Sequence, residues 1–217
     1  MKKTITSANS EPTAEQPVLP VVGIITLHGW KLATGLYWQN LSNTAHIGQE
    51  LIRVGRENGD DLVCVPKVKN PRQAGYITKT KLSGMTGVRS LAGGLVEAHA
   101  GSWLGMFELP DDSGLYYFIA VINDHILATS DIVGALDEIQ VLFERTLSCG
   151  SWNYVVAPEG MNVPGSTVRR LSLEEMLTKR RAPKIKALEF KLEENLLIRI
   201  ILSWTREVKT QTINSCT

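Results

Sequence analysis

The residues of this sequence that could carry out chemistry are four histidines, three cysteines and a few neighbouring carboxylates. A metal site needs such ligands at close spacing, and a nucleophile needs a base beside it in the fold. No two histidines stand four residues apart, and no two cysteines form a close pair; the residues are His28, His46, His99, His125, Cys64, Cys149 and Cys216. The sequence therefore predicts no metal site, and it indicates structural thiols in a reducing compartment.

Carboxylates could support general acid–base catalysis, which requires two of them to face one another. Asp111 and Asp112 lie in a Pro-Asp-Asp-Ser-Gly segment, whose residue types favour a tight turn. Asp131 lies in an expected loop between a strand and a helix, and we interpret it as a turn residue too. Neither a Gly-x-Ser-x-Gly elbow nor a phosphate-binding Gly-rich loop is present. We predict no catalytic residue, no cofactor and no enzymatic activity.

The composition narrows the class of protein. The chain has 217 residues, of which 43% are hydrophobic and 21% charged, as in a globular protein with one large or two small domains. The 23 Lys and Arg residues nearly balance the 22 Asp and Glu residues. This balance argues against a nucleic-acid-binding protein, which normally has a basic excess.

Aromatic and basic residues are the best candidates for contact with a protein partner. Trp30 is expected at the tip of a hairpin, where an aromatic side chain would be exposed. Tyr76 lies in a basic stretch whose cationic residues are Lys67, Lys69, Arg72, Lys79 and Lys81. We predict that these seven residues contact a partner, with a salt-dependent rate if that partner is acidic. The alternatives are a tryptophan that folds back onto the sheet and a basic loop that is merely solvated.

These residues must be positioned by strands and helices that the apolar spacing predicts. A first unit, at about residues 21–66, has the pattern of a hairpin, a helix and a strand. Its elements are expected at Val21–His28, at Leu32–Trp38, from Ser42 or Asn43 to Asn58, and at Leu62–Val65. Gly75–Thr80 could add a strand beyond this unit.

A second unit, at about residues 85–157, has a helix, a meander of strands, a second helix and a last strand. Its elements are expected at Met85–Ala100, Trp103–Leu109, Leu115–Ile122, His125–Ala128, Ala135–Leu147 and Trp152–Val156. Both units contain strands, a helix and then a strand. This order predicts an α/β or α+β fold, with a mixed sheet and helices packed against it. Trp103 is expected to anchor the core of the meander.

The two ends of the chain have different patterns. Residues 1–20 contain no signal-peptide pattern and are predicted to be a disordered tail. Ser172 to Glu175 form a capping box that should start a short helix through Thr178. In the extension at 183–217, residues 192–208 have a helical apolar stripe. The stripe is interrupted by charge, so we expect a helix buried against protein rather than a membrane span.

Several segments together resemble the pilin accessory PilO family of type IVb pilus systems. Their order and intervals match the amino-terminal region of that family over about residues 21–182. The segments are Gly35–Leu41, Gln73–Tyr76, Gly84–Met85 leading to Ser90–Ala92, Ser102–Asp111, Tyr117–Val121, Ser130–Gly134 and Gly150–Trp152. No single segment is specific to this family, but the whole set of segments in this order is.

The resemblance implies a non-enzymatic scaffold or adaptor of the pilus assembly platform at the bacterial inner membrane. Members of the family are similar in having a cytoplasmic amino-terminal domain, one membrane span and a periplasmic part. The resemblance implies that the cytoplasmic domain is actin-like and that its partners are the assembly ATPase and other platform subunits. A homo-oligomer is also compatible with it. No clean apolar span follows residue 182, so we expect peripheral membrane association through partners or through the carboxyl-terminal helix.

The alternative function is an actin-like nucleotide-binding protein or a small hydrolase. An active actin-like ATPase has acidic phosphate loops, and Gly23–Gly35 contains no acidic residue. We therefore expect no nucleotide hydrolysis. The balanced charge of the chain separately argues against binding to nucleic acid.

Overall fold

Strands from distant parts of the sequence form the β-sheets of this protein. The computed structural model describes residues 22–42, 45–68, 72–82, 85–111, 113–177 and 182–188, and within these residues the strands form three sheets. The hairpin sheet has the strand order β1-β2-β6 and consists of β1 (Gly23–Leu27), β2 (Trp30–Thr34) and β6 (Arg89–Ser90). The four-stranded sheet has the order β13-β4-β5-β3, with strands at Lys186–Ala187, Leu62–Cys64, Gln73–Ile77 and Tyr37–Asn40.

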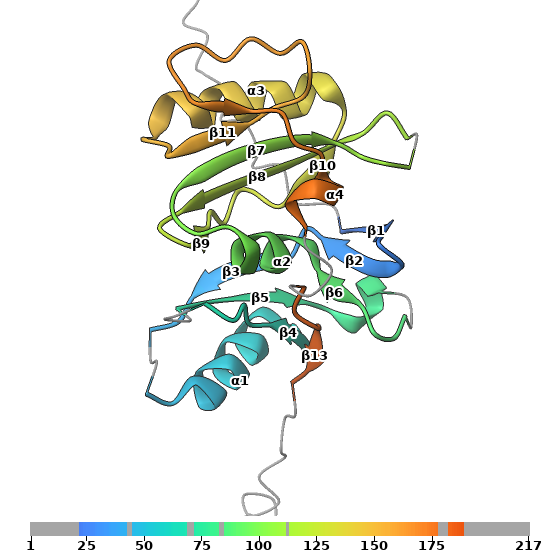
Figure 1. Ribbon diagram of the computed structural model, residues 1–217. Helices are drawn as coiled ribbons and strands as arrows, with labels where there is room; N and C mark the ends of the chain where they lie inside the picture. Colours follow the sequence, from blue (N-terminus) through green and yellow to red (C-terminus); the bar gives the residue numbers. More distant parts are fainter. Residues whose placement is uncertain are drawn as a thin grey trace, which may run out of the picture.

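The six-stranded sheet and the four-stranded sheet lie towards opposite ends of the molecule (Figure 1). The strand order of the six-stranded sheet is β10-β8-β7-β11-β12, and β9 pairs with β8. In chain order these strands are β7 (Trp103–Glu108), β8 (Tyr116–Ile122), β9 (His125–Ile126), β10 (Ile132–Gly134), β11 (Tyr154–Val156) and β12 (Val168–Arg169). β11 is parallel to β7 and β12, whereas the pairs among β7 to β10 are antiparallel.

The helices alternate with the sheets in layers, as Figure 1 shows. The helices are α1 (Ile47–Asn58), α2 (Leu91–Ala98), α3 (Leu136–Cys149) and the short α4 (Leu173–Met176), with a 3-10 turn, η1 (Lys79–Leu82). α3 covers the outer face of the six-stranded sheet, and α1 covers the outer face of the four-stranded sheet. α2 lies between these two sheets. The observed fold is thus the mixed α+β class expected from the sequence.

Side chains alternate along each strand, so the layers separate into three apolar clusters. On β7, Trp103 and Phe107 face the central cluster around α2, whereas Leu104 and Met106 face α3. All four are at most 2% exposed, because both faces of this strand are covered. A smaller cluster packs Val54 of α1 against the four-stranded sheet. The predicted core position of Trp103 is confirmed, since its side chain is 0% exposed.

The predicted hairpin is present, but its second strand is shorter than expected. β1 pairs with β2 from Gly23–Thr34 to Leu27–Trp30, and the chain turns at His28 and Gly29. The predicted strand Leu32–Trp38 is divided by Gly35, which has a φ of +75°. A positive φ turns the backbone out of the extended conformation, so β3 leaves the hairpin sheet and pairs with β5 instead.

Two predicted helices begin later than expected. α1 starts at Ile47. Ser42 lies before the helix, and its hydroxyl Oγ donates to Glu50 Oε1 of α1 at 2.5 Å. α2 starts at Leu91 rather than Met85, because Ser90 caps it by accepting from the N–H of Gly93 at 3.0 Å. β6, which contributes to the hairpin sheet, occupies the place where we expected helix.

The carboxyl-terminal part of the described chain returns to the first sheets. The capping box is confirmed: Ser172 Oγ accepts from the Glu175 N–H, and Glu175 Oε2 accepts from the Ser172 N–H. β13 then pairs with β4 of the four-stranded sheet. The predicted tail at 1–20 and the predicted helix at 192–208 lie outside the described residues. Among the helices that are described, none is long and apolar enough to cross a membrane.

Candidate functional site

Trp30 begins β2, and its indole is half-buried rather than exposed at a hairpin tip. The side chain packs against the central apolar cluster. The Arg89 guanidinium lies over the indole, 4.2 Å from the ring centroid, and Arg89 also donates to the Ala182 carbonyl at 2.6 Å. The alternative that the tryptophan folds back onto the sheet is therefore the one observed, and the expected exposed position was wrong.

Tyr76 cannot serve as a surface contact, because its side chain is only 1% exposed. It lies on β5, on the face that α1 covers, and belongs to the same apolar cluster as Val54. Burial raises the pKa of its hydroxyl to about 12. The prediction of Tyr76 as a contact residue is corrected. The sequence placed it in a basic stretch, but both faces of β5 are covered, and all five residues of the strand are buried.

The basic stretch does not form one patch. Lys67 follows β4 and Arg72 precedes β5, so these two exposed residues lie at one end of the β4–β5 pair. The exposed Lys79 and Lys81 lie on η1, beyond the other end of β5, and a five-residue strand is about 16 Å long. Lys69 lies outside the described residues. Antiparallel pairing therefore separates cations that are neighbours in sequence.

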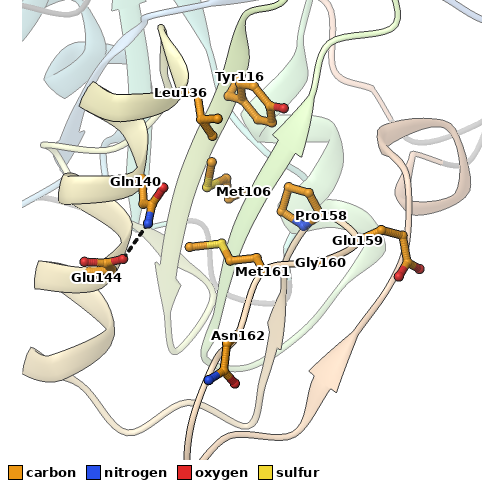
Figure 2. A pocket seen from close by; sticks show the side chains of 10 residues that line it. All are labelled: Met106, Tyr116, Leu136, Gln140, Glu144, Pro158, Glu159, Gly160, Met161 and Asn162. Carbon is orange, nitrogen blue, oxygen red and sulfur yellow. Dashed lines mark hydrogen bonds between the residues drawn. The ribbon is translucent and has the colours of Figure 1, made fainter.

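A groove opens beside α3, on the outer face of the six-stranded sheet (Figure 2). Its volume is about 470 Å³. On one side it is bounded by α3, and on the other by the loop that follows β11, with strand residues at its floor. The lining residues are Met106, Tyr116, Leu136, Gln140, Glu144, Pro158, Glu159, Gly160, Met161 and Asn162. Sequence reasoning missed this site, because its walls come from segments that no local motif connects.

The loop wall of the groove is fixed by Arg170. Its guanidinium donates to three backbone carbonyls: to Ala157 O at 3.1 Å, to Pro158 O, and to Met161 O at 2.7 Å. The Met161 N–H in turn donates to the Pro158 carbonyl at 3.4 Å. One planar cation thus satisfies several loop carbonyls at once, which pre-organises the wall.

A buried carboxylate, Asp131, joins the two ends of the molecule. Its Oδ2 accepts from the Leu36 N–H at 3.0 Å and from Trp38 Nε1 at 2.9 Å. Its Oδ1 accepts from the Tyr117 hydroxyl at 2.9 Å. The side chain is 0% exposed, and this burial raises the pKa of the carboxyl to about 7, although the hydrogen bonds oppose the rise.

Asp131 is therefore more than the turn residue we expected. Its φ of +70° fits a turn, but its side chain reaches β3 of the four-stranded sheet and β8 of the six-stranded sheet. Leu36, Trp38 and Tyr117 all donate to this carboxylate, so the group acts as a structural link. The only sequence signal was an acidic residue directly before the apolar pair Ile132 and Val133.

The remaining residues of chemical interest are also used structurally. Burial raises the pKa of the Cys64 thiol to about 12, so it is not a thiolate at neutral pH. His28 Nε2 lies 3.1 Å from the carbonyls of Glu174 and Leu177, and His99 Nε2 lies 2.8 Å from that of Met176. These contacts hold α4 in place. Over the described ranges, no group of three or more histidine, cysteine or acidic residues could hold a metal ion.

Comparisons with known proteins agree with the resemblance drawn from the sequence. A family model described as pilin accessory protein (PilO) matches residues 32–205. Among solved structures, the crystal structure of the cytoplasmic domain of BfpC is similar, with a TM-score of 0.60 and 19% sequence identity. The similarity covers 77% of this chain and 99% of the BfpC chain, and it establishes a shared fold. Among curated protein sequences, none shows significant similarity to this chain.

Proposed function

The chain belongs to the pilin accessory protein (PilO) family, and from that premise we propose that it is a non-enzymatic adaptor in the assembly of a type IVb pilus. It binds the assembly ATPase and other subunits of the inner-membrane platform and holds them in position. It works at the cytoplasmic face of the bacterial inner membrane, which it reaches through its partners or through residues 192–208. The family match over residues 32–205 is the observation that carries this proposal.

The use of the buried polar groups supports a binding role. Burial raises the pKa of Asp131 to about 7, and its carboxylate accepts hydrogen bonds from Leu36, Trp38 and Tyr117. Perturbed carboxylates often mark catalytic sites, but those sites are open to a substrate. Asp131 is 0% exposed. A rigid layered frame with exposed polar ends and an open groove suits a protein that positions partners.

The exposed cations at the two ends of the β4–β5 pair are separate candidate contacts. We propose that one of them, Lys67 with Arg72 or Lys79 with Lys81, meets an acidic surface of the ATPase. Rim charges of this kind change the association rate and its dependence on salt. An acidic side chain lies at each end, since Lys81 interacts with Asp60 and the Lys67 N–H donates to Glu97 Oε1 at 2.6 Å.

The adaptor role is tested by complementation in the native host. A strain that lacks the chain should lose surface pili, and the wild-type chain should restore them. The variants K67E/R72E and K79E/K81E have matched charge changes, so a defect in only one of them locates the contact. Normal piliation without the chain would contradict the proposal.

The alternative function, an actin-like nucleotide-binding protein or small hydrolase, is tested separately. A ligand that binds the folded state raises the melting temperature by mass action. We expect no shift with millimolar ATP and magnesium. A concentration-dependent rise would favour the alternative.

A further inference from the structure

The groove beside α3 has features that suit one kind of ligand. We propose that it binds a short segment of a partner protein in which apolar side chains stand next to lysine or arginine. This inference deepens the proposed function, because it rests on the chain being an adaptor with protein partners. The site lies on the six-stranded sheet, whereas the predicted cationic contacts lie on the four-stranded sheet.

The floor of the groove is apolar and adaptable. Met106 lies at its centre, with Leu136 on the α3 side and Pro158 and Met161 on the loop side (Figure 2). Leu136, the first residue of α3, is 47% exposed and offers an accessible apolar side chain. Met106 is only 1% exposed, so the accessible apolar surface comes from Leu136 and from the half-buried Met161. Methionine has a flexible, polarisable side chain that adapts to apolar ligands, and an apolar side chain of the partner would cover Met161 and Leu136.

The rim of the groove is acidic. Glu144 stands on α3 and Glu159 on the loop, and no lysine or arginine is among the lining residues. Glu144 Oε1 accepts from the Gln140 side-chain amide at 2.8 Å. Within the described parts of the chain, neither carboxylate forms an ion pair. Arg170 lies behind the loop wall and offsets part of this charge, but the two carboxylates at the rim still favour a cationic segment over an acidic one.

The dimensions of the groove set the length of the segment. Leu136, Gln140 and Glu144 follow one another at intervals of about one turn on α3, so the helical wall extends about 12 Å. This length accommodates two turns of a helix or about four extended residues. Because Arg170 already fixes the opposite wall, binding would require little ordering of the loop.

The test uses the full chain and a matched pair of synthetic peptides. Both are twelve-residue amphipathic peptides with leucines spaced four residues apart; one has lysines on its polar positions, and the other has glutamates there. Binding is measured by fluorescence anisotropy, and its location by amide chemical-shift changes. We expect the lysine peptide to bind more tightly and to perturb residues of α3 and of the loop 158–162.

Two variants make the test specific. E144Q/E159Q keeps the shape of the rim, and it should weaken lysine-peptide binding by about threefold to tenfold, as expected for two rim charges. The control E57Q/E174Q removes the same charge from exposed residues on α1 and α4, which do not line the groove, and it should leave binding unchanged. E144K/E159K should reverse the preference towards the glutamate peptide.

Three results would overturn the inference. They are equal binding of both peptides, shift changes confined to other surfaces, and self-association of the chain that the groove variants abolish. The last result would make the groove a contact between two copies. None of them bears on whether the chain binds the assembly ATPase, which a mixture of the two purified proteins tests independently.

Discussion

Trp38 donates its indole N–H to Asp131 across the boundary between two sheets, with Nε1 and Oδ2 2.9 Å apart. Trp38 lies on β3 of the four-stranded sheet, and Asp131 directly precedes β10 of the six-stranded sheet. Both side chains are at most 1% exposed. The Tyr117 hydroxyl and the Leu36 N–H also donate to this carboxylate. This link fixes how the two ends of the molecule are joined, and with it the placement of any partners they bind.

Removal of the Asp131 carboxylate should strongly destabilise the fold. D131A leaves three buried donors without an acceptor, and each unsatisfied group costs about 1–3 kcal/mol. We expect the free energy of unfolding, measured with urea, to fall by at least about 3 kcal/mol. D111A, in an exposed turn, is the control and should cost less than about 1 kcal/mol. Equal effects of the two substitutions would show that the link contributes nothing.

Asp131 should also make stability depend on pH. The folded protein holds the Asp131 proton up to about pH 7, because burial raises the pKa, whereas the unfolded chain releases it near pH 4. The folded state therefore binds more protons in this window, and its stability increases as pH falls through it. Between pH 8 and pH 5 the gain should be about 2–3 kcal/mol, measured by urea unfolding at both values.

The variant D131N has no titrating group at this position, so it should lose that gain. Glu50 does not interfere, because its bonds with Arg53 and Ser42 lower the pKa of its carboxyl to about 2, and its contribution is lost only in acid below the window. If wild type and D131N have the same pH profile, the raised pKa is wrong.

Trp103 should be the anchor of the central layer. Its ring stacks on Tyr154, with centroids 6.1 Å apart and an angle of 3° between the planes, and its Nε1 donates to the His99 carbonyl at 3.3 Å. W103A should lower the free energy of unfolding by about 3–5 kcal/mol. In Y154F the hydroxyl that is lost is buried and has no hydrogen-bond partner among the described residues, so the ring remains and the cost should be near zero. An unchanged denaturation midpoint for W103A would contradict its role.

Arg170 should control the order of the groove wall. R170K cannot reach all three carbonyls with one ammonium group, so the loop 158–162 should open more often. We expect its amides, Met161 above all, to exchange with deuterium at least about tenfold faster. R169K is the matched control, because Arg169 lies over the Tyr154 ring, 3.7 Å from its centroid, and does not touch the loop. Identical exchange in the two variants would rule out the positioning role of Arg170.

The sequence predicted the features that depend on local chemistry. The hairpin around Gly29, the helix end at Gly59 with its φ of +73°, and the capping box at Ser172 all follow from residues close together in the chain. The family resemblance also came from ordered local segments, and the family model confirms it.

Features that depend on distant pairing could not be predicted. β3, β6 and β13 pair with strands that are far away in sequence, and no local pattern selects those partners. Tyr76 was misplaced because no local pattern shows that both faces of β5 are covered by other elements of the fold. Asp131 was underestimated because its three donors come from Leu36, Trp38 and Tyr117, which the fold alone brings together. The groove beside α3 was missed for the same reason.

The most direct test of the adaptor role is sedimentation velocity of the purified full chain mixed with the purified assembly ATPase of the same pilus system. We expect a saturable complex that sediments faster than either protein and weakens as salt increases, since charged rims contribute to it. We also expect the complex to form when no nucleotide is bound to the chain. Two independent boundaries at tens of micromolar of each protein would contradict the adaptor role.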